Sequence, residues 1–95
     1  MIEPIYAAAL TGDVALIRVS SNGCTRKEDL YPQVSRSAGL MVLTVRRTQA
    51  DSCNQPVPEG MEMQWTFDEL GVARGTVLTV ANPLKQRDGT LGGQR

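Results

Sequence analysis

The sequence predicts an all-β fold: a small antiparallel β-sandwich (Ig-like) or a partly closed barrel, with about five or six short strands and one short helical turn. Three observations support this prediction. Apolar and polar residues alternate with a period of two in several segments, as in strands that bury one face. Turn-forming residues separate these segments. The chain has 95 residues and a hydrophobic fraction of 41%, which suits one globular domain.

The clearest strand runs from Met61 to Phe67. Its apolar side chains share one face, which we expect to point into the core, and its polar side chains share the other. Another predicted strand contains Pro32 and should lie at a sheet edge, because proline has no N–H to donate to a ladder. With that edge strand included, the remaining predicted strands are Ile5–Leu10, Val14–Ser20, Asp29–Arg36, Leu40–Arg47 and Thr76–Ala81. The alanines of the first of these also suit a helix of one or two turns, but a strand is the favoured interpretation.

A helical turn is expected after the Met61 strand. Thr66 and Glu69 have the spacing of a capping box, and Gly71 follows at the distance of a C-cap. We expect a single β domain over residues 1–84. The last residues, 85–95, contain three glycines and one leucine, and we expect a flexible C-terminal tail there.

Cys24 and Cys53 are predicted to form a disulfide. Both lie among polar turn residues, which suits a loop disulfide better than the alternative of two buried free thiols. We expect the strands that begin at Val14, Asp29 and Leu40 to form a meander. The first and third strands of a meander run parallel, so the two cysteines that follow them emerge on the same side.

A disulfide implies an oxidising compartment, and we therefore expect a periplasmic or secreted protein. The first residues lack the basic and apolar regions of a secretion signal. If the protein is exported, the chain is expected to be a mature form with an added Met1. The alternative is a cytosolic protein without the disulfide.

Composition argues against several classes of function. Ten Lys and Arg residues balance ten Asp and Glu residues, whereas nucleic-acid binders usually carry a basic excess. Histidine is absent, which removes the commonest general base and leaves two cysteines unable to build a usual zinc site. No glycine cluster has P-loop spacing, and no apolar run is long enough to cross a bilayer. We expect no enzyme activity, cofactor, metal site, nucleic-acid partner or transmembrane segment.

Met61, Met63 and Trp65 leave one metal interpretation open. Thioether sulfur suits Cu(I), and small periplasmic copper(I) carriers of β-barrel fold pair methionines with a nearby tryptophan. Those carriers add a histidine ligand, which this chain lacks. The alternation also places both methionines in the stripe that faces the core, so core packing is the favoured interpretation.

Basic residues gather near the two cysteines. Arg26 and Lys27 follow the first cysteine, while Arg46 and Arg47 end the strand that precedes the second. Such a patch attracts an acidic partner surface. The alternative is a solvated face with cross-strand pairs, for instance Arg46 with Glu62.

The loop Asn54–Glu59 contains Pro56 and Pro58. Proline limits the conformations of a loop before it binds, which is the property that a protease or enzyme inhibitor exploits. If the disulfide forms, it brings this loop close to Arg26 and Lys27. Loops gathered at one end of a rigid sandwich are a common recognition surface.

Several short motifs resemble those of a group of small exported bacterial proteins of unknown function. In that group the pattern is similar to GCT-x-K-x-D-[FL], then a strand, a basic residue and D-x-C. The resemblance spans about Val14 to Pro83, and it implies a disulfide-linked secreted β domain without a known activity. Its motifs here are GCTRKEDL at 23–30, VRR at 45–47, DSC at 51–53, EG at 59–60, WTFDELG at 65–71 and NP at 82–83.

The sequence therefore favours a non-catalytic exported β-sandwich that binds another protein or the cell envelope. The first alternative is a protease or enzyme inhibitor that presents a rigid loop. The second is a methionine-based periplasmic copper carrier. The residues expected to contact a partner are Arg26, Lys27, Arg46, Arg47, Pro56 and Pro58.

Overall fold

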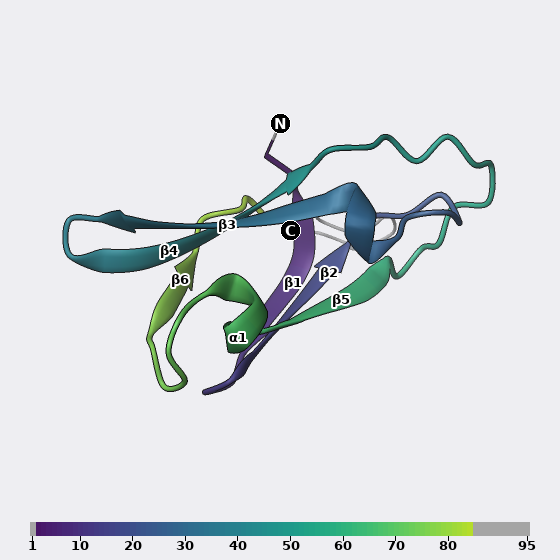
Figure 1. Cartoon of the computed structure of the whole chain (residues 1–95). Coiled ribbons are helices and arrows are strands. Elements are labelled where there is room, and N and C mark those ends of the chain that lie inside the picture. The colour runs from purple at the N-terminus through teal and green to yellow at the C-terminus, as the bar shows by residue number, and fades with distance from the viewer. Residues whose placement is uncertain (1, 85–95) are drawn as a thin grey trace, which may run out of the picture.

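Two three-stranded sheets pack face to face in the computed structural model, which describes residues 2–84 (Figure 1). The predicted all-β fold is confirmed, and the described residues form no closed barrel. A single 3-10 turn, η1 (Lys27–Asp29), precedes β3, and a short helix, α1 (Phe67–Leu70), follows β5. The strands are β1 (Ile5–Leu10), β2 (Val14–Val19), β3 (Leu30–Ser37), β4 (Leu40–Arg47), β5 (Met61–Thr66) and β6 (Leu78–Val80).

The first sheet has the order β1-β2-β5, with both pairs antiparallel. The second has the order β3-β4-β6, and Pro32 lies on the edge strand β3, as predicted. β6 is shorter than expected and runs parallel to β4, whereas the sequence predicted antiparallel pairing throughout. After β5 the chain crosses to the second sheet through α1. It enters that sheet beside the start of β4, where Leu78 pairs with Met41, and runs in the same direction as β4.

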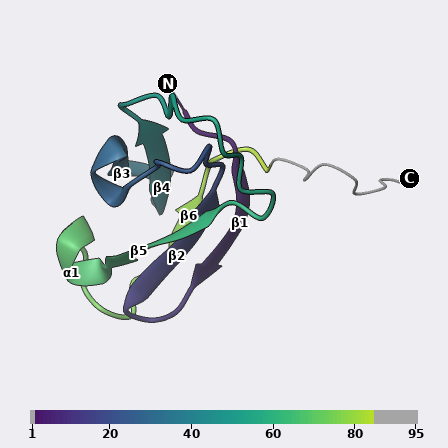
Figure 2. The same cartoon turned by 90° about the vertical axis from the view of Figure 1, so that its right-hand side faces the viewer.

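The predicted meander of β2, β3 and β4 is wrong. β3 and β4 do form a hairpin, but β2 lies in the opposite sheet between β1 and β5 (Figure 2). In the first sheet the register sets Ile17 opposite Met63 and Ala15 opposite Trp65, so β2 and β5 share one buried face. Periodicity identified the buried face of each strand, but it did not identify the neighbouring strand.

Residues from both sheets meet in one core. Ala15, Ile17 and Val19 of β2 have no exposed surface, and neither do Leu43 and Val45 of β4. At roughly 1.5–3 kcal/mol for each fully buried large aliphatic side chain, this stripe is the main favourable contribution to folding. The core cluster is completed by Ile5, Leu30, Met63 and Trp65.

The capping box before α1 is confirmed. The Thr66 hydroxyl accepts a hydrogen bond from the Glu69 N–H at 3.1 Å, and the Glu69 carboxylate accepts one from the Thr66 N–H at 2.8 Å. Gly71 ends the helix in the left-handed conformation, with φ at 77°. Phe67 begins the helix and is buried, with 1% of its surface exposed, so the turn is anchored to the core.

Two predictions about β5 are wrong. Met61 was expected in the core, but 36% of its surface is exposed, against 7% for Met63. Met61 is the first residue of β5 and therefore lies at the end of the strand. The expected Arg46–Glu62 pair does not form either: Glu62 pairs with Arg18 at 3.3 Å, its register partner on β2. Arg46 lies in the other sheet.

Asn82 joins the segment after β6 to β4 and to the N-terminal segment. It is buried, and its side-chain oxygen accepts a hydrogen bond from the Val45 N–H at 2.8 Å. Its side-chain nitrogen donates to the carbonyl oxygens of Glu3 at 2.6 Å and Val45 at 2.7 Å. This amide side chain thus helps to hold the end of the predicted β domain, together with the backbone bonds from the Ala81 N–H to the Leu43 oxygen and from the Ile5 N–H to the Pro83 oxygen. The predicted tail, residues 85–95, lies outside the described residues.

The contrast between Met61 and Met63 gives a matched test of the core. Met63→Ala should lower the free energy of unfolding by about 2–4 kcal/mol, because it removes buried methylene groups and leaves a cavity. Met61→Ala should cost less than about 1 kcal/mol, since its side chain is partly in water already. Urea unfolding followed by Trp65 fluorescence measures both. Equal losses in the two variants would contradict this burial pattern.

Candidate functional site

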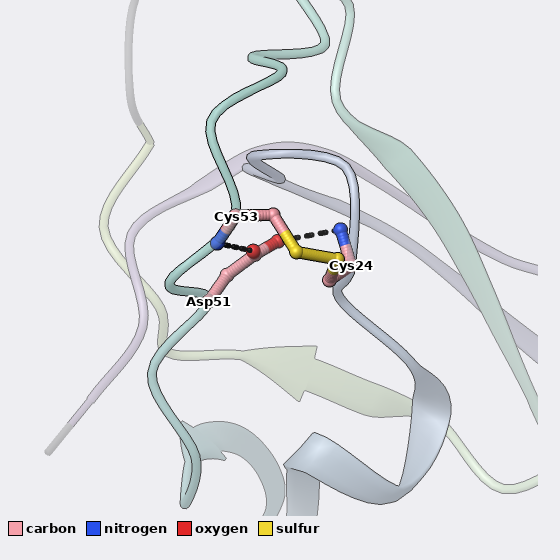
Figure 3. Close-up of side chains that lie close together, drawn as sticks. All are labelled: Cys24, Asp51 and Cys53. Atoms are coloured by element: carbon pink, nitrogen blue, oxygen red, sulfur yellow. Dashed lines mark hydrogen bonds between the residues drawn. A yellow bond between two sulfur atoms is a disulfide. The ribbon is translucent and has the colours of Figure 1, made fainter.

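The predicted disulfide is confirmed and joins the two sheets. Cys24 follows β2 of the first sheet, and Cys53 follows β4 of the second. The two Cα atoms lie 5.9 Å apart across a sequence separation of 29 residues. The bond thereby connects the long loop after β4 to the segment between β2 and η1, at one end of the sandwich (Figure 3).

Asp51 fastens the same two segments together by hydrogen bonds. Its Oδ1 accepts a hydrogen bond from the Cys53 N–H at 3.1 Å (Figure 3). Two backbone links run alongside, from the Gln55 N–H to the Asn22 oxygen and from the Val57 N–H to the Ser21 oxygen, each at 2.9 Å. The donors to Oδ2 all lie on the segment after β2: the N–H groups of Asn22 at 2.8 Å and Cys24 at 3.1 Å, and the hydroxyls of Thr25 at 2.7 Å and Ser21 at 3.2 Å.

Opposing effects act on the Asp51 carboxyl. Burial raises its pKa, but the hydrogen bonds from Thr25, Asn22, Cys53 and Cys24 together outweigh burial and hold the pKa well below its usual range. Asp51 is therefore ionised at neutral pH. Its carboxylate accepts several hydrogen bonds at once, and the donors would lose a comparable acceptor if the carboxylate were removed.

Cys24, Asp51 and Cys53 have ligand atoms within 4.8 Å of one another. Thiolate and carboxylate groups at such distances are able to hold a metal ion. In this structure the two sulfur atoms are bonded to each other, and the Asp51 oxygens accept the hydrogen bonds described above. In the disulfide form this cluster therefore acts as a structural junction.

Arg47 turns toward the interior and does not extend toward a partner. Its guanidinium forms two contacts with the buried Glu3 carboxylate, Nε–Oε1 at 2.9 Å and Nη2–Oε2 at 2.7 Å. It also donates to the Thr25 hydroxyl at 3.1 Å and the Ser20 carbonyl oxygen at 2.9 Å. The hydrogen bond to Glu3 raises the pKa of Arg47, although burial lowers it. Arg47 thus joins the N-terminal segment to the disulfide junction.

Two more of the predicted contact residues are engaged within the fold. Arg46 donates from Nε to the Gln33 side-chain oxygen at 2.7 Å, its diagonal neighbour on β3. Lys27 forms an ion pair with Glu69 at 2.8 Å and lies 5.9 Å from the centre of the Trp65 ring. The Lys27 hydrogen bond is the main reason why the pKa of Glu69 is lowered, and the Thr66 N–H adds to it.

Arg26 is different, because its side chain is exposed and forms no ion pair within residues 2–84. It lines a groove of about 510 Å³ beside the disulfide. The exposed Met61 lies in the same groove, and Arg26 thus places a positive charge beside an apolar side chain. The full lining is Gly23, Cys24, Thr25, Arg26 and Met61.

Pro56 and Pro58 lie on the surface of the long loop, as expected. Val57 between them is half-buried, and its backbone is tied to Ser21. Gly60 ends the loop with φ at 73°, where a Cβ atom would collide with the Val19 carbonyl and the Tyr6 ring. The loop therefore has a fixed exit. It lies next to the groove, because Gln55 is hydrogen-bonded to Asn22 and would meet a Cβ atom placed on Gly23.

We use the term disulfide-end surface for Arg26, Met61, Pro56 and Pro58, together with the groove beside them. The sequence pointed to three of these four residues and assigned Met61 to the core. It also gave no role to Asp51. An Asp two residues before Cys53 is typical of a turn in which the carboxylate accepts the N–H two positions on, and this signal was readable.

No protein-family model, curated protein or solved structure matches this chain. Among residues 2–84, none of the helices has the length and apolar character needed to cross a bilayer. The disulfide-end surface is therefore interpreted from its own geometry.

The disulfide gives a first test of this site. Non-reduced, denatured protein should show no thiol that reacts with Ellman's reagent. Replacing Cys24 and Cys53 together by Ser should lower the free energy of unfolding by roughly 2–4 kcal/mol, because the unfolded chain regains loop freedom. Two reactive thiols per chain would contradict the pairing.

Asp51 gives a second test, because its contribution to the free energy of unfolding depends on pH. Its pKa is lower in the folded than in the unfolded chain, so the carboxylate stabilises the fold above the unfolded-state pKa of about 3.9. That contribution is lost as the pH falls below this value. Asp51→Asn should be less stable than the wild type at pH 7, and the difference should shrink as the pH is lowered toward about 2.

Urea unfolding at a series of pH values measures this, with Glu28→Gln as the control. Glu28 is exposed, and its carboxylate accepts no hydrogen bond among the described residues. A difference between Asp51→Asn and wild type that stays constant with pH would contradict the role given to the ionised carboxylate.

Proposed function

We propose that this protein is an exported, non-catalytic β-sandwich that binds another protein through the disulfide-end surface. The observation that carries the proposal is the groove beside the disulfide. It is lined by the exposed Met61 and by Arg26, which forms no ion pair with any described residue. The resemblance to small exported bacterial proteins of unknown function supports the same interpretation.

Rigidity favours binding at this end. The segment after β2 and the loop after β4 are joined by the disulfide, by Asp51 and by the backbone links of Gln55 and Val57. Loops ordered before binding lose less conformational entropy when a partner arrives. Less of the favourable free energy of contact is therefore offset by the ordering of these loops when the complex forms.

The chemistry of the groove indicates the kind of partner. Met61 offers a polarisable, adaptable side chain, which suits contact with an apolar residue of another protein. Arg26 is able to form a bidentate pair with a carboxylate. We therefore expect an acidic protein surface that contributes at least one apolar side chain.

The proposal that the protein is exported depends on the disulfide, because disulfides persist mainly in oxidising compartments. We propose a non-catalytic role because the chain lacks the commonest general base. The sequence has no histidine, and the Asp51 carboxylate at the site is occupied by hydrogen bonds from the fold itself.

The proposal is tested on a partner captured by cross-linking in a bacterial envelope extract. Arg26→Ser should weaken binding of that partner by about threefold to tenfold and reduce its salt dependence, because a rim charge acts mainly on association. The matched control is Arg36→Ser, which removes an exposed arginine at the far end of β3. Surface plasmon resonance at several salt concentrations measures both variants.

Two results would overturn the proposal. One is a partner whose affinity is unchanged in both Arg26→Ser and Met61→Ser. The other is retention on protease-treated envelope, which would indicate a lipid or glycan in place of a protein.

The constrained loop favours a second candidate function, that of a protease inhibitor. Pro56 and Pro58 are exposed on either side of Val57, whose N–H is bonded to the Ser21 carbonyl. Titration against serine and cysteine proteases tests this. Pro58→Gly should weaken inhibition if the loop is the contact.

A further inference from the structure

The four edges of the two sheets differ in how they are protected. The edge strand β3 contains Pro32 and ends near Arg36, β6 has three residues, and β5 carries Glu62 and leads directly into α1. Proline, charge and shortness each discourage pairing with another chain. The stretch 7–10 of β1 has the sequence AAAL, and its three alanines are exposed. β1 has a register shift between Ile5 and Ala7, but beyond it the stretch from Ala7 to Leu10 carries none of these protections.

The start of this edge is covered at Ile5. The Ile5 N–H donates to the Pro83 carbonyl at 2.9 Å, and Ile5 forms a parallel bridge with Leu84. Among the described residues, the segment after β6 therefore covers only the start of β1. From Ala7 onward, β1 pairs with no described strand except β2 (Figure 2).

The hairpin between β1 and β2 shows which backbone groups face outward. The Thr11 N–H donates to the Val14 carbonyl, so these two residues are a hydrogen-bonded pair. Hydrogen-bonded and non-hydrogen-bonded pairs alternate along an antiparallel ladder. Ala9 and Ala7 therefore use their N–H and C=O groups toward β2, whereas Ala8 and Leu10 direct theirs away from it.

An apolar groove lies beside this edge. Ala8 is opposite the buried Ile17 and so belongs to the inner face of the sheet, yet it is exposed. The reason is a groove of about 590 Å³ between β1 and the end of β6, where the two sheets separate. Its lining is mostly apolar: Ile5, Tyr6, Ala7, Ala8, Val80, Asn82 and Leu84.

We propose that the β1 edge pairs with the β1 edge of a second copy of this chain, antiparallel about a two-fold axis. Ala8 of one copy and Leu10 of the other would exchange both of their outward N–H···O=C bonds, and the symmetric pair would do the same. Ala9 then faces Ala9 of the second copy. The two three-stranded sheets would become one continuous sheet across the interface.

Two features select a second copy as the occupant. A two-fold axis sets each residue near its own equivalent, so a charge on this edge would be repelled by itself. The stretch Tyr6–Leu10 carries no charge, and the net charge of the whole chain is zero. The second feature is size, because a non-hydrogen-bonded pair brings Cα atoms to about 4.5 Å. Alanine at the central position allows that approach.

The test is the association state of the full chain. Sedimentation velocity over roughly 1 µM to 1 mM should show a monomer–dimer equilibrium in the wild type. Ala8→Pro removes an outward N–H without touching the ladder to β2, and it should weaken dimerisation by roughly tenfold or more. Ala8→Val is the matched control, because it keeps the N–H and places a similar side chain in the groove. It should dimerise like the wild type.

Three outcomes would overturn the proposal. One is a wild type that stays monomeric over the whole concentration range. The partner of the β1 edge would then be residues 85–95 or another protein. Another is a folded Ala8→Pro variant that dimerises as the wild type does, since a different surface would then be responsible. If Ala8→Pro fails to fold, Ala8→Lys decides, because it keeps the N–H and adds a charge to the inner face. If Ala8→Lys dimerises with the same affinity as the wild type, the β1 edge is not the dimer interface.

Discussion

The ionised Asp51 carboxylate is the interaction on which the disulfide end depends. Cys24 and Cys53 come from different sheets, and a disulfide alone would leave the backbone on either side of it free to rotate. Asp51 removes that freedom, because it accepts hydrogen bonds from both cysteine N–H groups and from the Thr25 hydroxyl. The hydrogen bonds keep it charged by lowering its pKa against the effect of burial. Covalent and electrostatic links thus act on the same two segments.

Arg47 and Asn82 extend this organisation to the other parts of the chain. Arg47 contacts Thr25 at the junction and the buried carboxylate of Glu3 in the N-terminal segment. Asn82 binds the backbone of Glu3 and of Val45 on β4. Such buried polar contacts are costly unless every member is satisfied. The segments that contain Glu3 and Asn82 are thereby fixed against the sheets. The groove at Arg26 lies at one end of the sandwich, and the edge of β1 lies along one side.

The fold class was predictable because it depends on local patterns. The alternation around Met63 and Trp65 gave the buried face of β5, Pro32 gave an edge strand, and the Thr66–Glu69 spacing gave the helical turn. The candidate site was predictable only in part. Arg26 and the proline loop are at the surface, but a side chain such as Arg47 is long enough to turn inward, and only the position of Glu3 decides that it does.

The sequence by itself determined which residues are apolar on one face, where turns occur and that two cysteines in polar loops form a disulfide. These properties depend on neighbours within a few positions. Only the tertiary structure decided that β2 pairs with β5 and lies opposite the β3–β4 hairpin, that β6 runs parallel to β4, and that Met61 is exposed at the groove. The physical reason is that strand neighbours and the limits of the core follow from how whole faces pack against each other. A period of two is the same whichever sheet a strand joins.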